Sequence, residues 1–183
     1  MSDNTMTTAT TALTGERADL FKTLANARHF LRYTAKGLTD EQAQRRSTVS
    51  ELTIGGLIKH VAEVEDQWAR FAVEGRSAMA WDGLDFSNPG PELFEAFGNS
   101  FRMLPGETLA GLLDTYAEVA ARTDAVLAEL DLDVSHDLPS APWFTDTRWS
   151  ARRALLHIAA ETTQHAGHAD IIRESIDGQK SMG

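Results

Sequence analysis

The sequence predicts an all-α protein, an antiparallel four-helix bundle with long irregular connections. Four stretches of the 183-residue chain repeat apolar residues at spacings of three and four, which is the period of one helix face. Each stretch is long enough for a helix of roughly 30–40 Å at 1.5 Å per residue. Four amphipathic helices of this length can cover one another's apolar faces without a sheet, as in a helix bundle.

The first helix is expected to begin at Gly15. Before it, residues 1–14 carry six threonines and almost nothing to bury, so we expect a disordered tail there and a single bundle domain over 15–180. Gly37 is expected to end the first helix, and Thr39 with Gln42 has the form of a capping box that begins a short helical turn. The apolar stripe of this helix is Leu20, Leu24, Ala27, Leu31 and Leu38.

The other three stripes follow the same rhythm. The second runs from Ile54 to Phe71 and ends before Gly75, the third runs over 109–130, and the fourth runs over 155–176 and closes at Gly178.

Two segments interrupt the helical pattern. Residues 76–105 form a long connection, and loops this long in a compact domain are usually functional or disordered. The aromatic side chains of this connection predict packing rather than disorder. Residues 131–149 include DLPSAPWFTDTRW, which we expect to lie over one end of the bundle, with a short hairpin as one alternative. The aromatic residues of the two segments are Trp81, Phe86, Phe94, Phe97, Phe101, Trp143, Phe144 and Trp149.

Charge and composition exclude several functions. The net charge of −10 argues against binding to nucleic-acid phosphates and against docking on an anionic membrane. No run of roughly 18 apolar residues is present for a membrane span, and the N-terminus lacks a signal peptide, so we expect a cytoplasmic protein. The chain has no cysteine, so a metal must bind to His, Asp or Glu, and any thiol chemistry must use an external thiol.

The fourth stripe contains polar residues where a core seam should be apolar. His165 lies about 25° from the centre of the stripe and Glu161 about 65° from it, at 100° per residue, so the two meet from adjacent turns. The second stripe offers His60 on its flank. One His and a Glu-x-x-x-His pair provide three ligands for a divalent cation, Zn²⁺ first and Ni²⁺ or another transition metal next, with a position left open for water or substrate.

Other readings of these residues stay open. His165 can instead be a core histidine bonded to Glu161, and His168 can be a fourth ligand or a base that supports the site. We expect His29, His136 and His157 to lie outside the site. The acidic residues Glu63, Glu65 and Asp66 are expected to form a solvated face, with Glu63 or Asp66 as alternatives for orienting a ligand. Tyr116 is expected in the core, with its hydroxyl reaching the site as the alternative.

The segments KHVAEVE and HIAAETTQHAGHAD resemble the DinB/YfiT-like superfamily of metal-binding four-helix proteins, within it the branch related to mycothiol-dependent maleylpyruvate isomerase. The resemblance extends over about residues 13–178. It implies that His60, Glu161 and His165 stand at the metal positions. Many members have His at the position of Glu161, and Glu there is similar to the mycothiol branch, which favours zinc. His168 stands where many relatives carry Gln, so a ligand role for it is not implied.

The resemblance implies a metal-dependent thiol S-transferase with mycothiol or another low-molecular-weight thiol as cosubstrate. The alternatives are a non-catalytic metal- or ligand-binding stress-response protein and, less favoured, a metal-dependent hydrolase. No segment for the isomerase's C-terminal domain follows the last helix, so isomerisation itself is not expected. The electrophile is expected to bind to five aromatic residues of the two connections, and a carboxylate of the thiol to Arg152 or Arg153. The five are Trp81, Phe86, Trp143, Phe144 and Trp149. The exposed helix edges and the resemblance favour a homodimer.

Overall fold

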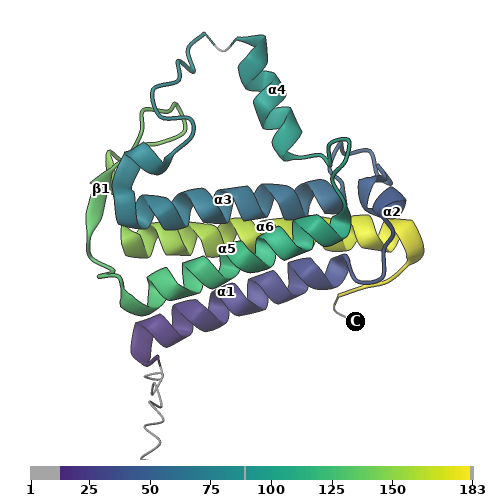
Figure 1. Cartoon of the computed structure of the whole chain (residues 1–183), viewed down its shortest axis with the longest axis horizontal. Helices are drawn as coiled ribbons and strands as arrows, with labels where there is room; N and C mark the ends of the chain where they lie inside the picture. Colours follow the sequence, from purple (N-terminus) through teal and green to yellow (C-terminus); the bar gives the residue numbers. More distant parts are fainter. Residues whose placement is uncertain (1–12, 89, 182–183) are drawn as a thin grey trace, which may run out of the picture.

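The computed structural model describes residues 13–88 and 90–181, and four long helices form most of it (Figure 1). These helices are α1 (Gly15–Thr34), α3 (Ile54–Glu74), α5 (Leu109–Glu129) and α6 (Ala151–Asp177). The all-α prediction is therefore confirmed. Within the described ranges, no helix combines the length and the apolar character that crossing a bilayer requires. Most of the tail expected over 1–14 lies outside the described residues.

Local capping explains where the long helices begin and end. Thr53, Thr108 and Ser150 each accept a hydrogen bond from the backbone N–H three residues later, at 3.1–3.2 Å, which satisfies a donor that the helix start leaves free. Glycines with positive φ, Gly75 and Gly178, follow the last residues of α3 and α6, as predicted.

The predicted capping box is also present. Thr39 and Gln42 bond reciprocally at the start of α2 (Asp40–Gln44). The first long helix, however, ends at Thr34, three residues before Gly37, where it had been expected to end.

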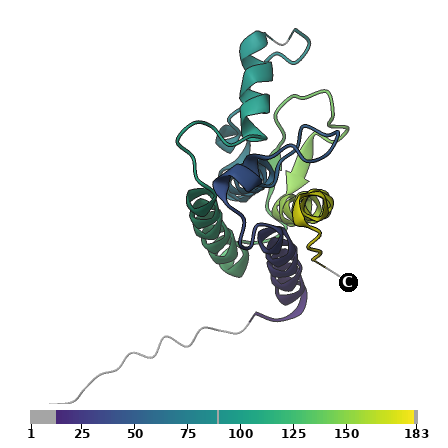
Figure 2. The same ribbon diagram turned by 90° about the vertical axis from the view of Figure 1, so that its right-hand side faces the viewer.

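The direction of the helices explains the long connection between α3 and α5. In Figure 1, α1 and α6 run one way, whereas α3 and α5 run the other way. The antiparallel packing expected from the sequence is therefore present between α3 and α6, whereas the neighbours α1–α6 and α3–α5 are parallel. The chain must therefore return along the whole length of α3, about 30 Å for 21 residues, before α5 can begin. Seen end-on in Figure 2, the four helices occupy the corners of the bundle. The connection between α3 and α5, called the crossover below, lies above α3 in this view.

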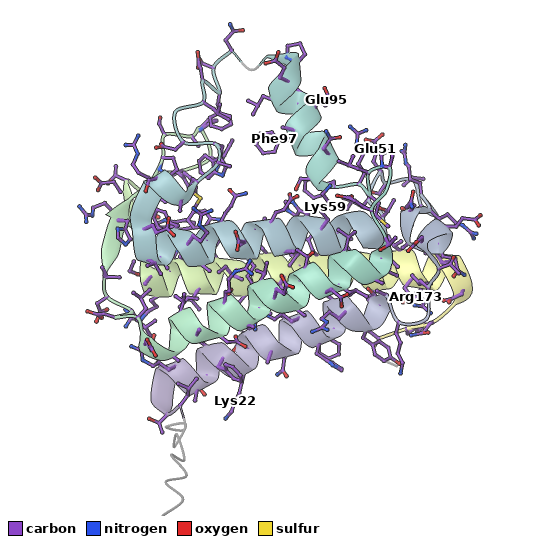
Figure 3. The ribbon with its side chains drawn as sticks, viewed as in Figure 1. Lys22, Glu51, Lys59, Glu95, Phe97 and Arg173 are labelled. Carbon is purple, nitrogen blue, oxygen red and sulfur yellow. The ribbon has the colours of Figure 1, made fainter. Side chains whose placement is uncertain are left out.

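The crossover contains two helical pieces where irregular structure had been expected. They are η1 (Gly75–Ala78) and α4 (Pro91–Ser100), and α4 has no buried residue. The packing predicted for its aromatic residues is wrong for Phe94 and Phe97, which are 65% and 44% exposed. Figure 3 shows Phe97 on α4, clear of the bundle.

The segment before α6 forms the hairpin that the sequence left as an alternative. Strands β1 (Ser135–Asp137) and β2 (Arg148–Ser150) pair antiparallel, with His136 opposite Trp149. The pairing brings Trp149 to the start of α6, where it is buried.

The bundle interior has two apolar clusters with a polar layer between them. One cluster packs the hairpin end, around Leu24, Phe71 and Leu155, and the other packs the opposite end, around Leu57 and Ile172. Buried polar side chains lie between the two clusters along the sequence of each helix: Arg28, Glu65, Thr123, Thr162 and His165. At the far end, Arg173 donates hydrogen bonds to the carbonyls of Thr34 and Lys36 and ties α6 to the end of α1 (Figure 3).

Candidate metal centre

Three side chains from two helices meet at the polar layer. His60 comes from α3, and Glu161 and His165 come from α6, the helix that packs against it. One ligand atom from each residue lies within 4.8 Å of the other two. The structure therefore brings together the three residues that the helical periodicity singled out.

The three donors lie close together, with His165 nearly buried and Glu161 partly exposed. His165 Nε2 lies 3.5 Å from Glu161 Oε2, and the rings of His60 and His165 meet edge-on with centroids 5.0 Å apart. The His165 side chain is only 10% exposed, whereas that of Glu161 is 27% exposed. Donors around a tetrahedral zinc stand about 3.4 Å apart, since the bonds are about 2.1 Å long, so shifts of about 1 Å suffice for a fit.

The surroundings favour the protonation states that a metal requires. Burial, together with the proximity of His165, lowers the pKa of His60 to about 4, although Glu161 acts in the opposite direction. A hydrogen bond from His165 and the nearby imidazoles hold the pKa of Glu161 below its usual value against the effect of burial. At neutral pH, His60 is neutral and Glu161 is ionised, which are the forms that coordinate cations.

The crossover supplies contacts to His60 that sequence reasoning missed. The Phe101 ring stacks on His60 with centroids 3.8 Å apart, and Ser100 Oγ lies 3.1 Å from His60 Nδ1. Ser100 also donates a hydrogen bond to Glu63. No local pattern marks Ser100, because only the return path of the crossover places it over α3.

The remaining histidines divide into neighbours of the group and unrelated residues. His168 lies outside the group, with its Nδ1 3.3 Å from the Nδ1 of His165. His157 was expected to point away, but its Nε2 is 4.0 Å from Glu161 and its ring packs on Trp68 and Trp149.

His29 and His136 take no part in the group. His29 is exposed on α1. His136 belongs to β1, where its ring N–H meets the Ala72 carbonyl oxygen at 3.3 Å. Both agree with their expected place outside the site.

The solvated face expected for three acidic residues of α3 is wrong for Glu65. Glu65 is fully buried and pairs with Arg28 on α1. Asp66 pairs with Arg122, and Glu63 accepts from Ser100. Tyr116, in contrast, lies in the core as expected; its buried hydroxyl finds no hydrogen-bond partner among the residues that the structure describes.

The five aromatic residues expected to receive an electrophile form one continuous cluster. Phe86 contacts Trp143, Trp81 stacks on Phe144, and Phe144 contacts Trp149, with centroids 4.8–5.9 Å apart. Through Trp149, the cluster reaches His157 and so the Glu161 side of the donor group.

The two arginines expected to receive a carboxylate of the thiol differ in their surroundings. The Arg152 guanidinium is engaged by Glu16 and Asp133. Arg153 lies over the Trp149 ring.

Comparisons with known proteins agree with this fold. The chain is similar to a conserved protein from Enterococcus faecalis, known from its crystal structure, with a TM-score of 0.64 and 16% identity over 91% of this chain and 100% of the other. No curated protein matches the sequence. The family model for mycothiol-S-transferase matches residues 19–178, which include all four long helices almost completely. This chain therefore belongs to the mycothiol S-transferase family of DinB/YfiT-like proteins.

Proposed function

We propose that the protein is a metal-dependent thiol S-transferase that binds a zinc-type ion through His60, Glu161 and His165. Its thiol is mycothiol or another low-molecular-weight thiol, and its second substrate is an electrophilic small molecule of the cytoplasm. The observation that carries this proposal is the meeting of two imidazoles and one carboxylate within 4.8 Å in a chain of this family.

The donor set suits the metal. Imidazole is a good ligand for Zn²⁺ and Ni²⁺, and a carboxylate completes a three-residue set that leaves a coordination position open. When bound there, the ion lowers the pKa of the incoming thiol and keeps it as the thiolate, the reactive nucleophile. With no cysteine in the chain, the sulfur must come from the cosubstrate.

The chain's own residues hold the reactants. The Glu161 side chain is more exposed than that of His165, and the aromatic cluster joins the site on the Glu161 side through His157. An apolar electrophile bound there is within reach of the sulfur, which gains an advantage from proximity. The thiol releases its proton to solvent, a carbon–sulfur bond forms, and a leaving group, where the electrophile has one, departs with its electron pair.

Metal content tests the ligand set. Protein purified without chelator should contain one divalent cation per chain by elemental analysis. His60→Ala, Glu161→Ala and His165→Ala should each lose most of it, whereas His29→Ala, an exposed histidine on α1, should keep it. Full metal content and affinity in His60→Ala would show that the proposed ligand set is wrong.

Turnover tests the reaction. We expect conjugation of a bimane or of chlorodinitrobenzene with one of four thiols: mycothiol, bacillithiol, glutathione and coenzyme A. Turnover should require the metal and be lost in Glu161→Ala. A metal-loaded protein that uses none of these thiols favours a non-catalytic binder, and product formation without thiol favours a hydrolase.

We also propose a homodimer. The large exposed apolar side chains of the crossover and the hairpin loop, such as Phe94 and Trp143, provide surface for such an interface. Sedimentation at micromolar concentration should give twice the chain mass. A species of 20.1 kDa would contradict this proposal.

A further inference from the structure

A hydrogen-bonded chain leads from the crossover to His60. Ser100, the last residue of α4, has its Oγ 3.1 Å from His60 Nδ1. The same oxygen contacts Glu63 Oε2 in a short hydrogen bond in which the hydroxyl is the donor. Glu63 lies three residues after His60 on α3, so both ends of the chain are fixed to one helix and Ser100 bridges them.

We propose that Ser100 and Glu63 are positioning residues that keep a proton on His60 Nδ1, so that Nε2 is the ring nitrogen offered to the metal. The proposal rests on the function proposed above, because it concerns one ligand of that site.

The count of protons gives the direction of each bond. The Ser100 hydroxyl donates to Glu63 Oε2, so its single proton points to Glu63. The Ser100 oxygen then offers a lone pair to the imidazole and must receive a proton from Nδ1. A neutral imidazole has only one N–H, so its proton on Nδ1 leaves the lone pair on Nε2 free.

The ring plane of His60 is fixed as well as its proton. Phe101 follows Ser100 directly and stacks on the His60 ring, with an angle of 23° between the rings. The crossover packs directly against α3 here, since the Phe101 carbonyl lies so close to Gly56 that a Cβ at position 56 would stand 1.9 Å from its oxygen. Two consecutive residues of the crossover thus set both the rotation and the tautomer of one ligand.

The second histidine also has a polar side chain near each ring nitrogen. His165 Nε2 faces Glu161 at 3.5 Å, while its Nδ1 faces His168 at 3.3 Å. Each histidine of the group therefore has its Nδ1 engaged by a polar side chain outside the group. Partners of this kind orient metal ligands, and their loss typically costs 10–100-fold in metal affinity.

The first readout is made on metal-free protein, so it does not depend on metal binding. Nitrogen-15 NMR of the histidine rings should show the Nδ1–H tautomer for His60 in the unsubstituted protein and in Ser100→Thr, which keeps the hydroxyl. Ser100→Ala and Glu63→Ala should shift His60 toward the Nε2–H tautomer. Ser77→Ala, another serine of the crossover with a hydroxyl bonded only to the Glu74 carbonyl, should change nothing.

The second readout is the affinity for Co²⁺, measured by competition with a chelator and by the visible absorption of the bound ion. Ser100→Ala should weaken binding about 10–100-fold, and Ser100→Thr should restore it. The proposal is overturned if His60 carries its proton on Nε2 in the unsubstituted protein, or if Ser100→Ala leaves both the tautomer and the affinity unchanged. An unsubstituted protein that shows the Nδ1–H tautomer, loses it in Ser100→Ala and yet binds no Co²⁺ would refute the metal-dependent function while supporting the positioning role.

Discussion

At the scale of single residues, the three donors of the site could be predicted from the sequence, whereas the buried charge of Glu65 could not. His60, Glu161 and His165 could be found in the sequence because they lie in or beside apolar stripes whose period fixes their direction. Glu65 could not be placed in the same way. It looks like one of three acidic residues on a helix face, yet its partner Arg28 lies on α1, 37 residues earlier in the sequence.

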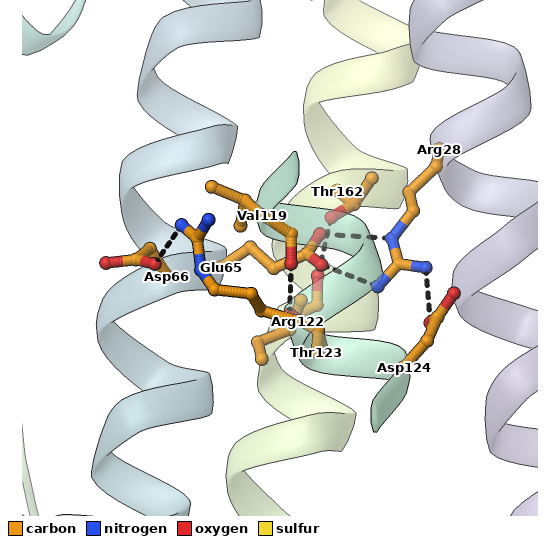
Figure 4. Close-up of polar contacts among 9 residues, drawn as sticks. Arg28, Glu65, Asp66, Val119, Arg122, Thr123, Asp124 and Thr162 are labelled. Carbon is orange, nitrogen blue, oxygen red and sulfur yellow. Dashed lines mark hydrogen bonds and ion pairs between the residues drawn. The ribbon is translucent and has the colours of Figure 1, made fainter. Parts of the chain in front are cut away.

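The Arg28–Glu65 pair is a buried contact across the bundle. Figure 4 shows the Arg28 guanidinium between the carboxylates of Glu65 and Asp124, from α1, α3 and α5. Glu65 is fully buried and Arg28 is 5% exposed. Removal of one partner leaves an uncompensated charge in the interior, which costs far more than the net value of the pair.

We therefore expect Glu65→Ala to lower the free energy of unfolding by about 3–5 kcal/mol. Urea denaturation followed by circular dichroism measures this loss. Arg28→Met with Glu65→Leu should recover much of it, because the charge left unpaired in the double variant is that of Asp124, whose side chain is 32% exposed. Glu74→Ala breaks an exposed pair with Arg70 and should have little effect. Equal stability of the Glu65→Ala and Glu74→Ala proteins would contradict a structural role for the buried pair.

At the scale of elements, the long helices were predictable and the crossover was not. Periodicity and caps gave the limits of α3, α5 and α6 to within a few residues. Phe94 and Phe97 of α4 and Phe101, which follows it, repeat at three and four, which is also a helical spacing, but the stretch is short and lies beside prolines and glycines. The parallel direction of α3 and α5, which makes the crossover necessary, depends on packing between distant segments and leaves no local signal.

Two helical glycines offer a matched test of how the crossover meets α3. A Cβ at Gly56 would clash with the backbone of Phe101, whereas a Cβ at Gly167 on α6 would meet nothing within 4 Å. We expect Gly56→Ala to destabilise the protein by about 1–3 kcal/mol through overpacking. Gly167→Ala should stabilise it by about 0.5–1 kcal/mol, because alanine favours the helix.

Thermal unfolding of both variants measures the difference. Gly56→Ala should also weaken metal binding, since Phe101 stacks on His60, whereas Gly167→Ala should not. If Gly56→Ala were as stable as the unsubstituted protein, the crossover would not pack against α3 as the structure shows.

At the scale of the whole molecule, the proposed metal links α3 to α6. His60 belongs to α3, which also contacts α5, and the other two donors belong to α6, which also contacts α1. The three donors come together only in the folded chain, because about 100 residues separate His60 from Glu161. A cation that binds to the native state and not to the unfolded chain must therefore stabilise the whole bundle.

The size of this stabilisation follows from mass action. A free metal concentration one hundred times the dissociation constant adds about 2.7 kcal/mol to the free energy of unfolding. For a domain of this length, 1 kcal/mol corresponds to about 2–4 °C in Tm, so Zn²⁺ should raise the Tm of chelator-treated protein by about 5–11 °C. Differential scanning calorimetry with and without Zn²⁺ measures the shift. Glu161→Ala should lose it and His29→Ala should retain it, because only the first removes a donor from the group. A full shift in Glu161→Ala would mean that the stabilising cation binds elsewhere on the molecule.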